Sequence, residues 1–159
     1  MPLAALTLAR DWHVRFIETM PLGVREVAAL ARERLVPNAE SRARIEAALG
    51  RLAALAADDP SDEARNYRLP GGRGIVGFIS PVTEPYCGTC NRMRLTAEGR
   101  FHLCLLNDDE LDVRAALRAG GGLDAVAAIL LRAVRHKPTG HRLDLGLSTE
   151  RREMYQLGG

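Results

Sequence analysis

Three cysteines are the residues of this chain whose type and spacing most clearly predict chemistry. Two residues separate Cys87 from Cys90, and thirteen residues separate Cys90 from Cys104. Two thiolates at the first spacing can bind one metal centre, and the fold must bring the third to it. In a chain without an export signal, this spacing favours metal or redox chemistry over a disulfide framework. We predict that the three cysteines jointly bind a metal centre.

Two other interpretations use the same residues. Free cysteine is among the most buried residue types, so all three could be inert core residues. The spacing and the neighbouring glycine, prolines and arginines argue against that interpretation. Zinc is the sharper alternative, because Cys87, Cys90, His102 and Cys104 would complete a closed tetrahedral site. Spacing alone does not separate zinc from iron–sulfur, and His102 is the deciding residue because only the zinc site requires it.

A hairpin would bring Cys104 back towards the first two cysteines. Alternate side chains of a strand share a face, so Cys90, Arg92 and Arg94 would lie together. Residues 97–99 are typical of a three-residue hairpin loop, with a glycine at the left-handed position. Counting back from this loop pairs Thr96 with Arg100, Arg94 with His102 and Arg92 with Cys104. A two-residue loop would instead turn Cys104 to the opposite face.

The pattern of the remaining elements is typical of an α+β protein. We predict strands at residues 13–17, 67–70 and 75–80, with a glycine-rich turn between the last two. Helices are predicted at residues 25–35, at 38–49 with Asn38 as the N-cap, and at 123–137. Asp124 begins the last helix, basic residues end it and Pro138 stops it, so we expect a purely structural role for it. Because little precedes the strand at 13–17, we expect the chain to begin partway through a larger domain.

Composition narrows the class of protein. The chain has 159 residues, 47% hydrophobic and 26% charged, which is typical of a globular protein. Its net charge of +2 gives no argument for nucleic-acid binding. All but one of its 22 basic residues are arginine, which a GC-rich genome explains, so each arginine must be judged by its position. We expect no membrane span, because no apolar run reaches roughly 18 residues, and no signal peptide; the expected location is the cytoplasm.

Three separated motifs resemble one family. Residues 78–82 and 87–96, running on through Cys104, resemble the C-terminal part of the GTP 3′,8-cyclase family, radical S-adenosylmethionine enzymes of molybdenum-cofactor biosynthesis. Residues 15–23 look like the last barrel strand of that family, and residues 154–159 resemble its double-glycine tail. The resemblance covers almost the whole chain in order. An auxiliary-cluster domain of another radical enzyme is a weaker alternative, because the double-glycine tail argues against it.

The resemblance implies roles for individual residues. Cys87, Cys90 and Cys104 match ligands of a [4Fe–4S] cluster whose fourth iron binds the purine of GTP. Arg92, Met93 and Arg94 match positions that contact GTP, which suits the planar, permanently charged guanidinium. Met20 matches a position that contacts S-adenosylmethionine, and Gly158 and Gly159 match a catalytic tail that reaches into the active site.

The resemblance also implies what this chain lacks. The family's N-terminal half carries another three-cysteine motif for the radical-generating cluster, and this sequence has no such motif. We therefore expect residues 1–23 to be a remnant of a partial β/α barrel and residues 24–159 to be the C-terminal cluster- and GTP-binding region. The family reaction abstracts a ribose hydrogen from GTP and joins the ribose to the purine, giving (8S)-3′,8-cyclo-7,8-dihydroguanosine 5′-triphosphate. The chain is then a truncated gene product, a fragment, or the partner of a separate N-terminal radical S-adenosylmethionine chain. We expect it to bind the cluster and GTP weakly by itself but not to turn over, and the full-length family implies a homodimer.

Overall fold

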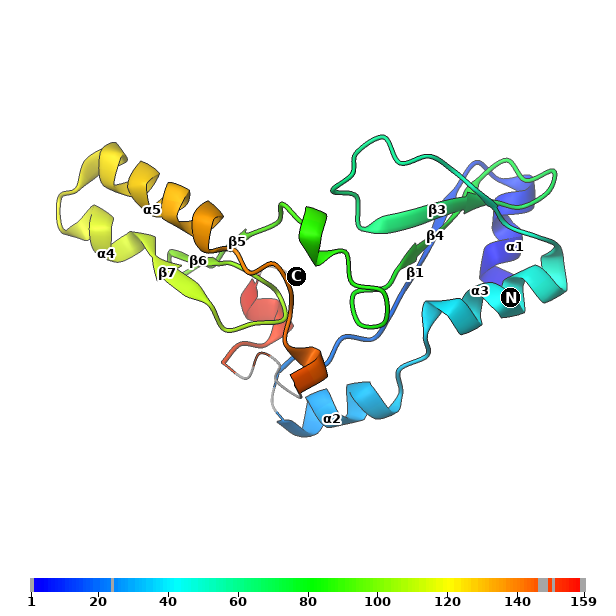
Figure 1. The fold of residues 1–159 in the computed structure, drawn as a ribbon, viewed down its shortest axis with the longest axis horizontal. Helices are drawn as coiled ribbons and strands as arrows, with labels where there is room; N and C mark the ends of the chain where they lie inside the picture. The colour runs from blue at the N-terminus through cyan, green and yellow to red at the C-terminus, as the bar shows by residue number, and fades with distance from the viewer. Residues whose placement is uncertain (1, 24, 146–148, 150, 158–159) are drawn as a thin grey trace. The chain divides into compact units, whose positions relative to one another are not determined.

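The computed structural model describes residues 2–23, 25–145, 149 and 151–157. It confirms a mixed α+β protein and divides the chain into two compact units (Figure 1). Unit 1 contains residues 1–20 and 34–90, and unit 2 contains residues 21–33 and 91–159. The chain therefore passes between the units three times. The predicted boundary at residue 23 separates a barrel remnant from a cluster- and GTP-binding region. It is a different kind of division from these compact units and stays a prediction.

Unit 1 is built on a four-stranded sheet with the strand order β1-β4-β3-β2. β1 and β4 run parallel with Phe16 opposite Phe78, whereas β3 is antiparallel to both β4 and β2. Its elements are α1 (Pro2–Ala9), β1 (His13–Ile17), α3 (Asn38–Leu49), β2 (Ala53–Ala54), β3 (Ala64–Arg68), β4 (Ile75–Ile79) and the 3₁₀ turn η1 (Cys87–Thr89).

Two helices cover the apolar residues of this sheet. Ala4 of α1 and Ile45 of α3 are fully buried and join Val76 and Phe78 of β4 in one core cluster. The Phe78 ring stacks on Phe16 at 5.7 Å between centroids. These contacts fix the parallel pair β1–β4. The chain that leaves β4 forms the loop that leads to Cys87 and Cys90.

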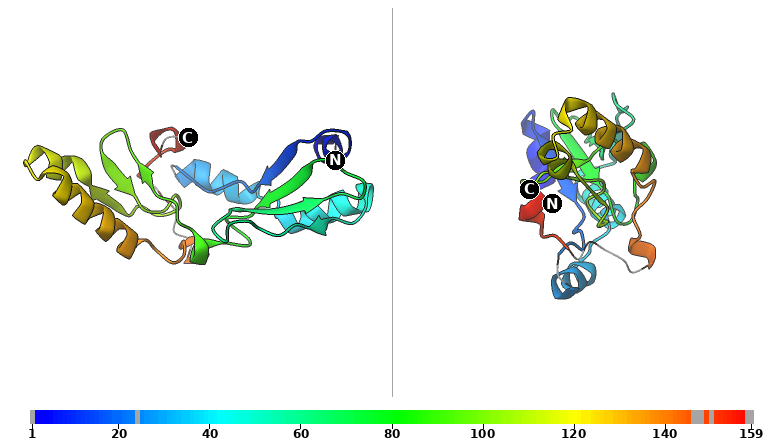
Figure 2. Two further views of the ribbon diagram at one scale, coloured as in Figure 1. Left: turned by 90° about the horizontal axis from the view of Figure 1, so that it is seen from above. Right: turned by 90° about the vertical axis from the view of Figure 1, so that its left-hand side faces the viewer.

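Unit 2 combines a small sheet with a helical hairpin. Its three strands have the order β5-β6-β7 and are all antiparallel (Figure 2). α4 packs against both α5 and β6, and the Asp112 side chain caps α4 by accepting from the Ala115 N–H at 2.8 Å. The elements are α2 (Arg25–Glu33), β5 (Arg94–Leu95), β6 (Arg100–His102), β7 (Glu110–Asp112), α4 (Val113–Arg118), α5 (Gly122–His136), η2 (Leu143–Leu145) and η3 (Met154–Leu157).

Several predicted elements are confirmed, and some are corrected. The strand at 13–17 and the helix at 38–49 have the predicted bounds, and the ends of α2 and α5 differ from the predicted ones by at most two residues. The strand predicted at 67–70 is instead Ala64–Arg68. The prediction of Asn38 as an N-cap is wrong: Pro37 holds that position, and the Asn38 side chain bonds to strands β1 and β4. Helix α1 was not predicted, although it supplies part of the core.

Two further structural findings bear on the class of protein. The described strands form two open sheets and no closed barrel. Among the described residues, no helix is both long and apolar enough to cross a membrane.

Candidate metal and nucleotide site

The first two cysteines lie at the two ends of one tight turn in unit 1. The Cys90 N–H donates to the Cys87 carbonyl at 3.2 Å, and the Thr89 N–H donates to the Tyr86 carbonyl at 3.2 Å. Both cysteines are half-buried. A turn of this kind folds two thiols separated by two residues back towards the same centre, which is the local geometry that the predicted metal site requires.

Glu18 anchors the loop that leads to this turn. Its side chain is 2% exposed and accepts from the N–H groups of Val82 and Thr83 at 3.1 and 3.0 Å, and from the Asn38 N–H at 3.0 Å. The Thr83 hydroxyl donates to it as well. Burial raises the pKa of Glu18, but these hydrogen bonds outweigh it and leave the pKa below its ordinary value. A carboxylate directly after β1 therefore fixes the start of the cysteine-bearing loop.

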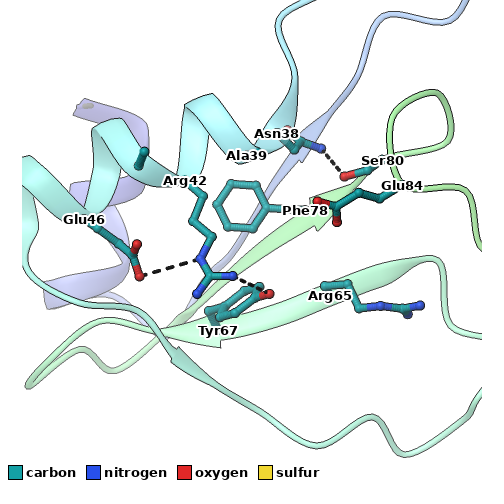
Figure 3. Close-up of a pocket in the computed structure, with 10 residues that line it drawn as sticks. Asn38, Ala39, Arg42, Glu46, Arg65, Tyr67, Phe78, Ser80 and Glu84 are labelled. Carbon is teal, nitrogen blue, oxygen red and sulfur yellow. Dashed lines mark hydrogen bonds and ion pairs between the residues drawn. The ribbon is translucent and has the colours of Figure 1, made fainter.

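Asn38 extends the same anchor. Its amide donates to the Ile79 carbonyl at 2.9 Å and to the Ser80 hydroxyl at 3.0 Å, so it joins α3 to the end of β4 (Figure 3). Neither Glu18 nor Asn38 was predicted as a site residue. For Glu18 the available signal was a carboxylate immediately after a predicted strand, a position where parallel strands present side chains to one edge. Asn38 begins α3 and follows no strand, so it carried no such signal.

Unit 1 also contains a pocket of about 270 Å³ between α3 and the sheet (Figure 3). Arg42 points across it and lies 4.5 Å from the centroid of the Tyr67 ring, with Glu46 as its ion-pair partner at 3.6 Å. The lining residues are Asn38, Ala39, Arg42, Ala43, Glu46, Arg65, Tyr67, Phe78, Ser80 and Glu84. Since its central arginine is already engaged by protein groups, we assign this pocket no ligand.

The predicted hairpin is present in unit 2. Arg94 pairs with His102, the Thr96 N–H donates to the Arg100 carbonyl at 2.9 Å, and Gly99 has the left-handed φ of 79°. The three-residue loop is therefore confirmed. The ladder ends at the Arg94–His102 pair, so the predicted pairing of Arg92 with Cys104 is not part of the strands.

Cys104 lies just beyond this ladder, in a tight turn. Its carbonyl accepts from the Asn107 N–H at 3.2 Å, and the N–H of the preceding Leu103 donates to the Asp109 carbonyl at 3.0 Å. Lys137 donates from Nζ to the carbonyls of Arg92 at 2.6 Å and Leu103 at 2.9 Å. The chain segments that enter β5 and leave β6 are thus held together by a side chain from the end of α5.

The predicted nucleotide-binding residues have different surroundings. Arg92 is exposed, Met93 and Arg94 are half-buried, and Arg94 donates from Nη1 to the Leu157 carbonyl at 3.1 Å. Met20 is half-buried and is the last residue of the first segment of unit 1. Gly158 and Gly159 lie outside the described residues. Arg94 therefore contacts the last described residue before the double glycine, a contact that the sequence did not indicate.

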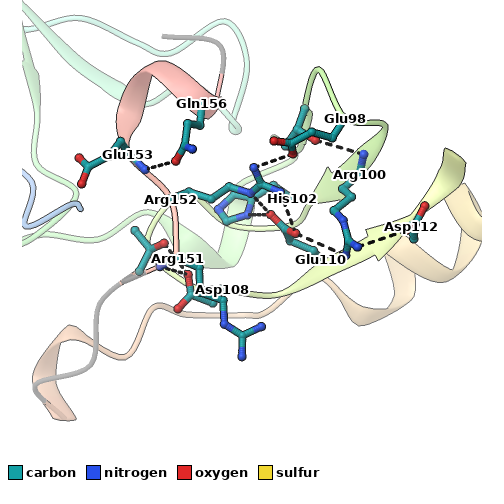
Figure 4. Close-up of polar contacts among 12 residues, drawn as sticks. Glu98, Arg100, His102, Asp108, Glu110, Asp112, Arg151, Arg152, Glu153 and Gln156 are labelled. Carbon is teal, nitrogen blue, oxygen red and sulfur yellow. Dashed lines mark hydrogen bonds and ion pairs between the residues drawn. The ribbon is translucent and has the colours of Figure 1, made fainter. Parts of the chain in front are cut away.

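A network of ionic contacts ties the C-terminal segment to the small sheet (Figure 4). Arg152 donates from Nε and Nη2 to the Glu110 carboxylate, and its Nη1 lies 2.8 Å from Glu98. The hydrogen bond from Arg152, against a smaller opposing effect of burial, lowers the pKa of Glu110. The same bond raises the pKa of Arg152. His102 is 1% exposed and shares the Glu110 carboxylate through Nδ1 at 3.3 Å.

The donor set fits an iron–sulfur or zinc centre. All three cysteines of the chain lie in the described residues and carry reduced thiols. Within either unit, the described residues contain no group of three His, Cys, Asp or Glu side chains that could hold a metal. Cys87 and Cys90 belong to unit 1, and Cys104 belongs to unit 2.

Comparison with known proteins identifies the family. A model of the family Molybdenum Cofactor Synthesis C matches residues 12–143. The GTP 3′,8-cyclase of Pelotomaculum thermopropionicum is 41% identical over 157 residues, which cover 99% of this chain and 47% of that protein. The GTP 3′,8-cyclases of Moorella thermoacetica and Gloeobacter violaceus are 42% and 38% identical, over 100% and 99% of this chain and 48% of each relative. The chain thus spans about half the length of these relatives. It belongs to the Molybdenum Cofactor Synthesis C family and is similar over its whole length to GTP 3′,8-cyclases.

Proposed function

We propose that this chain is the C-terminal, substrate-binding part of a GTP 3′,8-cyclase of molybdenum-cofactor biosynthesis. In this proposal Cys87, Cys90 and Cys104 hold a [4Fe–4S] cluster and leave one iron for the purine of GTP. The observation that carries the proposal is the Cys87–Cys90 turn in a chain that is 41% identical to a GTP 3′,8-cyclase over 99% of its length. The C-terminal position in the parent enzyme accounts for the absence of a second three-cysteine motif.

The cluster would supply one open coordination position that accepts a neutral donor atom and fixes its orientation. The protein's own residues do the rest of the positioning. Glu18 holds the backbone at Val82 and Thr83 and so limits the freedom of the loop that precedes Cys87. Because Glu18 remains ionised, this anchor persists at neutral pH.

The arginines would bind the nucleotide. A guanidinium offers five N–H donors and keeps its charge, which suits phosphate oxygens and purine edges. Arg92 is exposed, and its guanidinium would face the ligand from the segment between Cys90 and β5. Arg94 uses one of its N–H groups to donate to the Leu157 carbonyl. Its other donors would bind the nucleotide, so one side chain would contact both the nucleotide and the C-terminal segment. Met93 lies between them and would contribute apolar contact.

The remaining roles follow the family pattern. We propose that residues 1–23 are a remnant of a partial barrel, that Met20 contacts S-adenosylmethionine, and that Gly158 and Gly159 act in the cyclisation. Turnover would need the N-terminal radical S-adenosylmethionine half of the family, and the assembled enzyme would be a homodimer. GTP cyclisation by this polypeptide alone would contradict this part of the proposal.

Anaerobic reconstitution tests the proposal directly. We expect about four irons and four sulfides per chain, a visible absorption band, and GTP binding that weakens by about tenfold when Arg92 is changed to alanine. Arg118→Ala, which removes an exposed arginine from the last turn of α4, is the matched control and should leave GTP binding unchanged. A colourless protein that retains stoichiometric zinc would overturn the proposal.

Zinc remains the second candidate because of one observation. The buried His102 shares Glu110 through Nδ1, while its Nε2 has no hydrogen-bond partner among the described residues. Metal-bound histidines commonly have such a carboxylate on the other ring nitrogen. In a site of Cys87, Cys90, His102 and Cys104, His102→Ala should release the metal. In the iron–sulfur proposal, His102→Ala leaves the iron content unchanged.

A further inference from the structure

Lys137 is the only lysine of the chain, and it links three segments of unit 2. It follows the last residue of α5, where its N–H donates to the Val134 carbonyl at 3.4 Å. Its Nζ contacts the Arg92 carbonyl at 2.6 Å and the Leu103 carbonyl at 2.9 Å. Because one nitrogen contacts both oxygens, the two carbonyls lie within two hydrogen-bond lengths of each other.

These carbonyls lie next to the cysteines in the sequence. Arg92 is two residues after Cys90, and Leu103 immediately precedes Cys104. Leu103 is only 2% exposed, and its N–H is held by the Asp109 carbonyl. The Cys104 carbonyl is held in turn by the Asn107 N–H. The backbone is therefore fixed on both sides of Cys104, and Lys137 connects that fixed segment to the residues that follow Cys90.

We propose that Lys137 is a positioning residue for the metal centre, because its ammonium group ties the segment that follows Cys90 to the segment that carries Cys104. This inference rests on the proposed function. It assigns a role in metal binding to the end of a helix that the sequence indicated to be purely structural. The tie restricts the conformations available to the third thiol before metal binds, so less ordering remains for the metal to impose.

The chemistry of the contact explains why a lysine suits this position in an arginine-rich chain. The lysine ammonium is a compact charge with three donors that can point in different directions. Two carbonyls that converge on one point match it well. The planar arginine fork presents parallel donors, which suit the two oxygens of one carboxylate better than two separate carbonyls. A lysine-to-arginine exchange therefore preserves charge but not this geometry.

The test compares Lys137→Met with two matched variants in the full chain. After anaerobic reconstitution, iron release to a chelator should be roughly fivefold faster in Lys137→Met. Arg135→Met removes an exposed charge from the same helix end and should release iron at the wild-type rate. Val113→Ala weakens the core of unit 2, and its lowered thermal midpoint should not be accompanied by a comparable gain in release rate. Lys137→Arg should fall between wild type and Lys137→Met.

A second measurement uses the metal-free protein. Amide hydrogen exchange at Leu103 and Asn107 should be faster in Lys137→Met than in wild type, and unchanged in Arg135→Met. Wild-type protein that binds no iron contradicts the proposed function, while faster exchange would still support the tie made by Lys137. Iron release and amide exchange at wild-type rates in Lys137→Met would overturn the role of Lys137 and leave the proposed function standing.

Discussion

Two glutamates hold together segments of the chain that are distant in sequence. Glu18 joins the end of β1 to the start of α3 and to the loop after β4, and Glu110 joins β7 to the C-terminal segment through Arg152. In both cases hydrogen bonds to the ionised form lower the pKa against the opposing effect of burial. The charge of each carboxylate is therefore part of the structure that supports the candidate site.

Glu18→Gln tests the first of these anchors. The amide keeps the size of the side chain but loses the charge, and its NH₂ group would face N–H donors. We expect unit 1 to lose about 1–3 kcal/mol of stability. Denaturant unfolding of the metal-free protein, followed by amide exchange at Val82 and Thr83, measures this effect. Glu40→Gln removes one partner of an exposed ion pair with Arg44 and should cost less than about 0.5 kcal/mol. Equal losses in the two variants would contradict the anchoring role of Glu18.

Glu110→Gln tests the second anchor through pH. Because the folded-state pKa of Glu110 lies below its ordinary value of 4.5, the unfolded chain binds its proton first as the pH falls. The stabilisation by Glu110 is therefore complete well above pH 4.5, and it is lost as the pH falls through the lower folded-state value. Wild type should exceed Glu110→Gln in stability at pH 7, and the difference should shrink progressively in acid.

Urea unfolding at a series of pH values measures this difference. Glu26→Gln, which removes an exposed carboxylate from the first turn of α2, is the control and should stay close to wild type throughout. A difference between wild type and Glu110→Gln that grows in acid would contradict the assigned role of Glu110.

Among the elements, the β5–β6 hairpin depends most on a single residue. Gly99 has φ of 79°, and its carbonyl accepts from the N–H groups of Val113 and Arg114 at 3.0 Å each. A Cβ at this position would lie 2.9 Å from the Arg114 Cβ. The same glycine thus closes the hairpin loop and connects it to the first turn of α4.

We expect Gly99→Ala to destabilise unit 2 by about 1–2 kcal/mol, because alanine resists the left-handed conformation and contacts Arg114 too closely. Amide exchange at Thr96 and Val113 should rise with it. Gly140→Ala is the control, since no atom lies within 4 Å of the added methyl group. Stability of Gly99→Ala equal to that of Gly140→Ala would contradict this account of the hairpin.

The sequence predicted those elements whose signals are local. The hairpin register was predictable because a glycine at the left-handed position fixes the loop length. The strand at 13–17 and the helix at 38–49 were predictable from flanking turns and apolar spacing. Helix α1 was not, because leucine and alanine cover nearly all its faces and leave no periodicity. Asn38 was misread as a cap because its partners on β1 and β4 are brought to it only by tertiary packing.

The residues that support the candidate site could not be predicted from the sequence. The cysteine spacing is a local signal, whereas Glu18, Lys137 and Arg152 act through partners far away in the sequence. Nothing in the pattern around Lys137 distinguishes it from the basic residues that commonly end helices. Contacts of this kind follow from the assembled fold, so they require a structure.

At the scale of the whole molecule, the three cysteines proposed to hold the cluster are divided between the two compact units. Cys87 and Cys90 belong to unit 1, and Cys104 belongs to unit 2. A centre that binds only when all three thiols are in place stabilises the folded form of both units by mass action. If the cluster forms, metal binding should therefore couple the stability of one unit to that of the other.

We predict that Val76→Ala, which opens a cavity in the core of unit 1, shows this coupling. In the metal-free protein it should raise amide exchange in β3 and β4 while leaving β6 and α4 unchanged. In the reconstituted protein, exchange in β6 and α4 should rise as well, because opening unit 1 releases two of the three ligands and with them the stabilisation of unit 2. Cys104→Ser in the Val76→Ala background removes the third ligand, and β6 and α4 should then again be insensitive to Val76→Ala. If amide exchange in β6 and α4 is the same with and without Val76→Ala in fully reconstituted protein, the cluster does not couple the two units.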